Sequence, residues 1–193
     1  MTALAVLVTA GCAAPSDPPA TEAAPVETPA PTPEPAPEPE PASIELPTTC
    51  DDLFSIDVVR EHTDPRVDPM DLWDDIGEHG FGPVAVSAYK GAEQSIRCEY
   101  GINATDAFSQ VIVSELTPEV REHFMAELEN ARFERRTEGP EKIFELQPEP
   151  GKPFTPLDYT FIGDVWVATH NSVGSLMDPA VARVLELNPH LAE

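Results

Sequence analysis

Positive charge is scarce in this sequence. Its 193 residues include 11 lysines and arginines against 35 aspartates and glutamates, which gives a formal net charge of −24 at pH 7. DNA and RNA are bound by basic surfaces that neutralise phosphates, so we expect no nucleic-acid partner. The same negative charge repels the chain from an anionic membrane surface. We therefore expect any membrane contact to come from an anchor rather than from the folded surface.

Long apolar runs are also missing. A short one opens the chain in residues 1–11 (MTALAVLVTAG), but a membrane-spanning helix needs about 20 apolar residues. The run carries no charge and ends on the small residues Thr9, Ala10 and Gly11, directly before Cys12. This pattern is typical of the apolar core and cleavage region of a secretory signal. We expect residues 1–12 to be a signal segment.

Cys12 is the residue on which the expected localisation depends. A cysteine directly after small residues resembles the lipobox of bacterial lipoproteins, in which the thiol is acylated and the cysteine becomes the first residue of the mature chain. Each buried CH₂ contributes about 0.8 kcal/mol, so two or three chains such as palmitate hold a protein on a membrane. We expect lipidation at Cys12 and a place on the extracytoplasmic face of the cell membrane. The alternative is a chance cysteine in an apolar N-terminus.

Basic residues are absent from the first part of the chain. Signal segments normally begin with lysine or arginine, whereas the first basic residue here is Arg60. We therefore expect the true start to lie upstream of Met1.

Residues 13–43 contain neither a basic nor an aromatic residue. They hold 11 prolines and six acids, and Val26 is their one large apolar side chain. Such a segment buries too little apolar surface to offset the entropy of folding, so we expect it to be disordered and extended. At about 3.1 Å per residue in polyproline II, it would reach roughly 95 Å. We interpret it as a tether; the alternative is a ligand for a proline-reading domain.

Cysteine is sparse, with three residues in the whole chain. When Cys12 is assigned to lipid, Cys50 and Cys98 remain as a pair. In an exported protein, and without His or Cys at metal-ligand spacing, such a pair predicts a disulfide. Closing a loop of about 49 residues stabilises a fold by roughly 4 kcal/mol in the chain-entropy estimate. The bond is expected to link the first helix to a strand.

Residues 44–193 predict one globular domain, because apolar residues return at regular spacing and the length suffices to bury a core. The predicted elements, in chain order, are a helix at 48–62, strands at 95–101 and 108–116, a helix that begins at 117, a strand at 142–147, a hairpin at 157–170 and a helix that begins at 178. Residues 84–89 fit a strand or a helix, and residues 64–83 predict an irregular insert. This order indicates an α+β domain whose antiparallel β-sheet of about five strands packs against helices.

Two local signals support these elements. Thr117 is a preferred helix N-cap and is followed by proline at the first helical position. Gly163 and Asp164 form a two-residue turn between apolar runs, which predicts a hairpin. The first helix is expected to have Thr48 or Thr49 as its N-cap.

The stretches CDDLFSIDVV (50–59) and CEY (98–100) carry a resemblance to a known group of proteins. With the lipobox and the proline-rich tether, they resemble a pattern in actinobacterial envelope lipoproteins of unknown function. There, a Cys-x-x-Leu helix start pairs with a downstream Cys-x-Tyr or Cys-x-Trp strand. The resemblance implies a disulfide-linked α+β domain outside the cytoplasmic membrane, related to the PsbP-like sandwich of some mycobacterial lipoproteins. It implies no reaction, and it does not cover the insert at 64–83.

The insert gathers potential metal ligands. They are Asp64, Asp68, Asp71, Asp74, Asp75 and Glu78, together with His62 and His79. Hard oxygen donors in a loop suit Ca²⁺, and Asp64, Asp68 and Asp71 are the candidate ligands. The spacing does not follow an EF-hand, so the alternative is a solvated acidic loop. Two histidines alone leave a zinc site short of ligands, and no resident cofactor is expected.

Motifs of catalysis are missing as well. The chain has no Gly-x-Ser-x-Gly and no free thiol, and its five histidines lie in unrelated contexts. We therefore expect no enzyme. The alternative is a Ca²⁺-dependent or carboxylate-based enzyme acting on cell-wall polymers, because acids are too frequent here for their spacing to exclude one.

Aromatic residues point to binding. Phe124, Tyr159, Phe161 and Trp166 either line an apolar pocket or form the core. Trp73 and Phe81 fall in the acidic insert, where a large exposed ring marks a partner contact. The sequence therefore predicts a lipid-anchored envelope lipoprotein that presents a non-catalytic domain for binding a protein or small ligand of the cell envelope.

Overall fold

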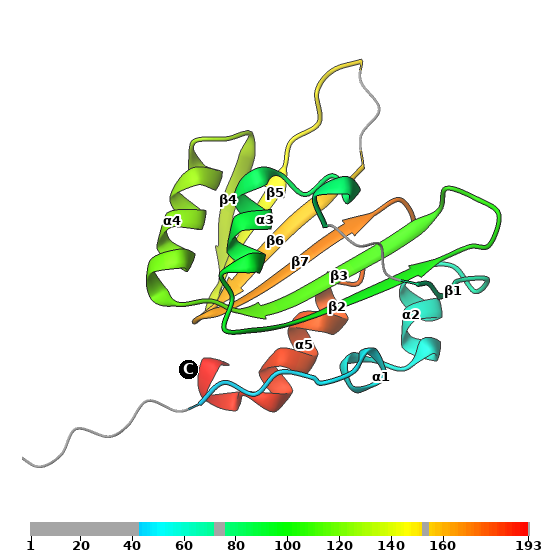
Figure 1. Ribbon diagram of the computed structural model, residues 1–193, viewed down its shortest axis with the longest axis horizontal. Coiled ribbons are helices and arrows are strands. Elements are labelled where there is room, and N and C mark those ends of the chain that lie inside the picture. The colour runs from blue at the N-terminus through cyan, green and yellow to red at the C-terminus, as the bar shows by residue number, and fades with distance from the viewer. Residues whose placement is uncertain (1–42, 72–75, 152–154, 193) are drawn as a thin grey trace, which may run out of the picture. The chain divides into compact units, whose positions relative to one another are not determined.

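The computed structural model describes residues 43–71, 76–151 and 155–192 (Figure 1). Within them, a seven-stranded antiparallel sheet has the strand order β1-β2-β3-β7-β6-β5-β4. The strands are β1 (Asp68–Pro69), β2 (Gln94–Gly101), β3 (Phe108–Glu115), β4 (Phe133–Glu138), β5 (Glu141–Leu146), β6 (Leu157–Ile162) and β7 (Val165–Asn171). The α+β class and the antiparallel sheet are confirmed, whereas the expected number of about five strands is wrong.

The two additional strands are the edges of the sheet. β1 has two residues, one of them Pro69, and proline in a sheet is confined to edges because it cannot donate to the ladder. β4 has the sequence FERRTE, in which charged residues outnumber the β-branched and aromatic ones. Charged residues on an edge strand keep a sheet from pairing with other chains. Because such a strand lacks the β-branched and aromatic residues typical of strands, its sequence does not predict a strand.

Five α-helices and two 3₁₀ helices accompany the strands in the described residues. They are α1 (Cys50–Leu53), α2 (Ile56–His62), η1 (Ile76–His79), α3 (Pro83–Lys90), α4 (Pro118–Glu129), α5 (Met177–Leu187) and η2 (Pro189–Ala192). The helix expected at 48–62 is two helices, because Phe54 adopts an extended conformation between them. The ambiguous residues 84–89 are helical, and Pro83 at the first position suits a helix start. The predicted cap at Thr117 is confirmed, since its side chain accepts a hydrogen bond from the Val120 amide at 3.3 Å.

One face of the sheet packs against α3 and α4 through an aromatic core (Figure 1). Phe124 of α4 is its centre, with ring centroids 5.0 Å from Trp166 and 5.3 Å from Tyr159. Edge-to-face pairs of this kind add to the free energy gained by burial. Phe124, Tyr159, Phe161 and Trp166 are each at most 1% exposed, so these rings are core rather than the lining of a pocket.

The other face packs against α1, α2 and α5 (Figure 1). Val111 and Val113 of β3, with Val165 and Val167 of β7, meet Val184 of α5 in a fully buried aliphatic cluster. Side chains alternate along a strand, so these valines lie opposite the aromatic core. We call the part of this face formed by β2, β3 and β7 the apolar half.

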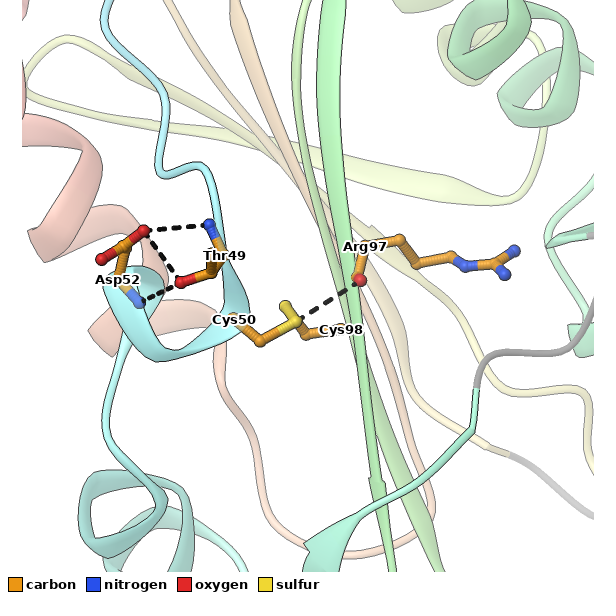
Figure 2. The surroundings of a disulfide bond; sticks show 5 residues. All are labelled: Thr49, Cys50, Asp52, Arg97 and Cys98. Carbon is orange, nitrogen blue, oxygen red and sulfur yellow. Dashed lines mark hydrogen bonds between the residues drawn. A yellow bond between two sulfur atoms is a disulfide. The ribbon is translucent and has the colours of Figure 1, made fainter.

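A disulfide between Cys50 and Cys98 links α1 to β2 in the apolar half (Figure 2). The Cα atoms are 5.7 Å apart, which confirms the predicted pair and its connection of the first helix to a strand. Figure 2 also shows the N-cap of α1, where Thr49 and Asp52 exchange side-chain to backbone hydrogen bonds of 3.1 Å. Of the two residues expected to cap this helix, Thr49 does so.

No helix in the described parts of the chain combines the length and the apolar character that a membrane span requires.

Candidate functional site

Two acids of the insert, Asp64 and Asp68, are engaged with arginines. Both carboxylate oxygens of Asp64 accept hydrogen bonds of 2.9 Å from Arg66, which hold the pKa of this carboxyl down at about 2. Asp68 pairs with Arg60 at 2.7 Å, and Asp71 is exposed. In residues 43–71, 76–151 and 155–192, no group of three or more His, Cys, Asp or Glu side chains is placed to hold a metal ion. The calcium site at Asp64, Asp68 and Asp71 stays a prediction, and the arginine contacts of Asp64 and Asp68 favour its alternative, a solvated acidic loop.

Phe81 is not the exposed ring that its place in the insert suggests. Its side chain is 3% exposed, and its centroid lies 6.4 Å from that of Tyr159 and 5.7 Å from that of His170. The chain returns to the sheet just before α3, so Phe81 belongs to the aromatic core, and the exposure on which the predicted partner contact was based is absent. Trp73 and Cys12, the other residues predicted to meet a partner or a lipid, lie outside the described residues.

A different set of acids gathers on strands β4, β5 and β6. The register places Glu145 opposite Asp158, Ile143 opposite Thr160 and Arg136 opposite Ile143. Because Thr160 pairs with Val167, these side chains share the face of the sheet that carries the apolar half. We call this second part of the face the charged half.

The charged half contains a hollow of about 150 Å³, which we call the acidic hollow. Its lining residues come from β4, β5, β6 and the start of α5: Arg136, Glu138, Glu141, Ile143, Glu145, Asp158, Thr160, Ser175, Met177 and Asp178. Five of them are acids and one is a base. The strands supply the floor, and the first turn of α5 supplies a wall.

Arg136 is the one base of the lining, and its guanidinium is paired with two carboxylates of the same lining. Its guanidinium lies 2.6 Å from Glu138 and 3.2 Å from Glu145, and these hydrogen bonds raise the pKa of Arg136. A planar guanidinium that bridges two carboxylates offsets one of their two negative charges. Glu138 and Glu145 thus share one counter-charge within the protein.

Asp158 and Glu141 are not compensated in this way. Burial raises the pKa of Asp158 to about 6, and the neighbouring charge of Glu145 adds to the effect while Arg136 opposes it. Burial also raises the pKa of Glu141, as do the charges of Glu138 and Asp178, while the charge of Arg136 opposes the shift. Within the described residues, neither carboxylate receives a hydrogen bond or an ion pair. The hollow therefore holds negative charge for which the chain supplies no direct partner.

Thr160 adds an unpaired hydroxyl to the hollow. The residue is 1% exposed, and its Oγ1 is buried without a hydrogen-bond partner in the described residues. A buried polar atom left unsatisfied costs about 1–3 kcal/mol. The floor of the acidic hollow thus combines two uncompensated carboxylates with one unused hydroxyl.

A second hollow, of about 300 Å³, lies beside the disulfide. Its lining includes Ile56, Met70 and Tyr100, and burial raises the pKa of the Tyr100 hydroxyl to about 12. Its carboxylate Glu99 accepts a hydrogen bond from Gln110. Because its buried acid is paired, this hollow shows less sign of a missing ligand than the acidic hollow does.

The sequence contained one signal of the acidic hollow that pattern reading missed. Charged residues stand at alternate positions in Glu134, Arg136 and Glu138, and acids flank an apolar residue in the same spacing at Glu141, Ile143 and Glu145. A period of two places such residues on one face of a strand, but only if the segment is a strand. Because β4 was not expected, its charges could not be aligned with those of β5 and β6.

Comparison with known proteins adds no residue to this site. No protein-family model matches the chain, and neither the curated proteins nor the solved structures contain a match to it. The site is therefore described from its own geometry.

Proposed function

We propose that this chain is a lipid-anchored envelope lipoprotein that presents a non-catalytic binding domain outside the cytoplasmic membrane. In this proposal residues 1–12 are the signal segment, Cys12 carries the lipid, and residues 13–43 are the tether of the domain at 44–193. The pattern of residues 1–43 supports the anchor and the tether. The disulfide supports export, because such bonds persist in oxidising compartments.

We infer further that the domain binds a positively charged group in the acidic hollow. The observation that carries this is the pair of carboxylates, Asp158 and Glu141, that lie part-buried without a partner among the described residues. Burying a charge without a counter-ion destabilises a fold, and a cationic ligand removes that penalty. Relief of this electrostatic penalty would contribute to the free energy of binding a cation in the hollow.

The test is a titration of the full chain with cationic ligands, using isothermal calorimetry. Cys12→Ala removes the lipid, and the disulfide is kept. We expect the double variant Glu141→Gln/Asp158→Asn to lose binding. A matched control, Glu119→Gln/Glu127→Gln, removes two exposed acids from α4 on the other face and should bind as the parent does. Equal loss in both variants would show that net charge, and not the hollow, attracts the ligand.

A carboxylate-based enzyme is the second candidate, and one observation favours it. Asp158 lies opposite Glu145, and burial raises the pKa of Asp158 to about 6, which brings it nearer to the neutral pH at which a general acid works. Glycoside hydrolases use such a pair as acid and base. Against this, the lining has no aromatic ring, and 150 Å³ is small for a sugar ring and its neighbours.

Incubation with cell-wall polymer distinguishes the two candidates. The binding proposal predicts no release of reducing ends or soluble fragments by the parent chain. Release that disappears in Asp158→Asn and persists in Glu119→Gln would support the enzyme instead.

A further inference from the structure

The hollow beside the disulfide, which we call the disulfide hollow, differs from the acidic hollow in its chemistry. Its volume is about 300 Å³, against about 150 Å³ for the acidic hollow. Ligand pockets combine mostly apolar walls with a few polar groups, and this lining has that composition. The residues are Thr49, Cys50, Asp51, Ile56, Pro69, Met70, Glu99 and Tyr100.

The disulfide brings the walls of this hollow together. It holds the Cα atoms of Cys50 and Cys98 5.7 Å apart, which places α1 beside β2 (Figure 2). Tyr100 follows Cys98 on the same face of β2, about 6.8 Å further along the strand. Pro69 of β1 pairs with Tyr100. Residues of α1, β1 and β2 therefore line one space next to the covalent link.

Met70 is the exposed part of the lining. Its side chain is 41% exposed, and no other large apolar side chain in the part of the chain that the structure describes is as exposed. The Met70 amide donates a hydrogen bond of 2.9 Å to the Glu99 carbonyl, and its Sδ occupies the space that a Cβ on Gly101 would need. Met70 thus offers apolar contact from a position that its neighbours fix.

Among the described residues of the lining, Asp51 carries the charge that is left without a partner. Thr49 is engaged in the N-cap of α1, and the Glu99 carboxylate is already hydrogen-bonded. Asp51 is exposed and receives neither a hydrogen bond nor an ion pair from the described residues. Burial raises the pKa of Tyr100 to about 12, and the charge of Asp51 adds to this effect, so that charge acts inside the hollow.

Apolar walls with one carboxylate suit a cation whose charge is surrounded by carbon. A primary ammonium has three N–H donors and a guanidinium has five, and each of them needs an acceptor. The lining offers few acceptors that are not already engaged. A quaternary ammonium has no N–H, so its methyl groups can contact Ile56 and Met70 while its charge is attracted to Asp51 and to an aromatic ring such as Tyr100.

The acids around the disulfide hollow disfavour a ligand that also carries an anionic group. Asp52 and Asp57 are exposed in the first turns of α1 and α2, the helices that contribute Asp51 and Ile56 to the lining. Like charges repel, so a phosphate next to the ammonium would weaken binding. A free quaternary ammonium compound is therefore favoured over the choline headgroup of a phospholipid.

We propose that the disulfide hollow binds a small free quaternary ammonium compound of the choline type, with its methyl groups against Ile56, Met70 and the disulfide and its charge beside Asp51. This site is separate from the acidic hollow, which is formed by β4, β5, β6 and α5. The inference thus goes beyond the proposed function and does not depend on it.

The experiment is a two-dimensional NMR titration of the ¹⁵N-labelled full Cys12→Ala chain with four probes at matched ionic strength. They are choline, its neutral isostere 3,3-dimethylbutan-1-ol, ethanolamine and phosphocholine. We expect choline to shift the amide signals of residues 49–51, 56 and 98–100 with a Kd on the order of 1 mM. The others should bind about fivefold more weakly or not at all, because they lack the charge, lack the methyl groups or add a phosphate.

Two variants test the named contacts. Asp51→Asn removes the charge, and we expect the affinity for choline to fall about threefold. Its matched control is Asp57→Asn, which removes an exposed acid outside the lining and should bind choline as the parent does. Met70→Gln keeps the length of the side chain but makes it polar, so it should also weaken binding. All three side chains are exposed, and a melting curve verifies that the variants fold.

The outcomes separate this inference from the proposed function. Equal binding of choline and any other probe, equal loss in Asp51→Asn and Asp57→Asn, or no shift with choline at ten times the expected Kd would overturn the inference and leave the acidic hollow untouched. The variant Glu141→Gln/Asp158→Asn should bind choline as the parent does. Choline shifts that centre on residues 141–145 and 158–160, and disappear in that variant, would overturn the inference while supporting the proposed function.

Discussion

The apolar half and the charged half lie on one face of one sheet, and they differ in what their side chains do. In the apolar half, valines such as Val113 and Val167 are fully buried beneath helices. In the charged half, Glu141, Asp158 and Thr160 lie partly or wholly buried without the partners that their oxygens require. The apolar half stabilises the fold, whereas the charged half weakens it. A region that costs stability is where a protein is expected to keep a function.

The largest effect is expected when a carboxylate is placed in the apolar half and an apolar side chain in the charged half. Val167→Asp places an unpaired carboxylate at a site that is 0% exposed, and we expect it to lower the free energy of unfolding by on the order of 5 kcal/mol. Asp158→Val makes the reverse change in the charged half and should be neutral or stabilising. Urea denaturation of both variants is the measurement. Similar losses in the two would show that the halves do not differ.

The disulfide tests how much the apolar half depends on a covalent link. Replacing both Cys50 and Cys98 by alanine releases a loop with a sequence separation of 48 residues, which we expect to cost about 4 kcal/mol. Urea denaturation measures the loss. Because the acidic hollow is formed by β4, β5, β6 and α5, the double variant should still bind a cationic probe such as Nα-acetyl-lysine amide under conditions where it is folded. Loss of binding in the folded variant would show that the two halves are coupled.

The smallest expected effect concerns the pH dependence of the charged half. Asp158 faces Glu145 from β5 and senses the charge of Arg136 from β4, and burial raises its pKa from 3.8 to about 6. A carboxyl whose pKa is higher in the folded state binds its proton more tightly there. It therefore costs no stability below about pH 4, and the cost grows as the pH rises through about 6.

Asp158→Asn removes that cost. We expect a gain of about 1 kcal/mol at pH 7.5, after discounting the pKa shift for the solvent that reaches this part-buried group, and no gain at pH 4. Urea denaturation of the parent and the variant at both pH values measures it. A gain that is the same at both would contradict the assigned pKa.

Much of the fold could be predicted from local patterns. The proline after Thr117, the Gly163-Asp164 turn and the spacing of valines in β3 each determine a local structure through nearby atoms alone. The disulfide could be predicted from the small number of cysteines. What could not be predicted depends on tertiary context, as in the break at Phe54 and the return of Phe81 to the core.

The candidate site could not be predicted from the sequence, because it too depends on tertiary context. Its acids come from four elements, and they meet only because charged β4 pairs with β5 as the edge of the sheet. In a chain with 35 acids, no spacing marks the few that share a hollow. The sequence drew attention to Asp64 and Asp68 in the insert, but each of these has an arginine close enough to neutralise it.

The most direct test of the account is a two-dimensional NMR titration of the ¹⁵N-labelled chain with Nα-acetyl-lysine amide. We predict that amide signals shift in the charged half, at residues 141–145, 158–160 and 175–178, while those of residues 111–113 and 165–167 in the apolar half stay in place. Absence of shifts, or shifts centred on the apolar half, would contradict the claim that the acidic hollow is the binding site.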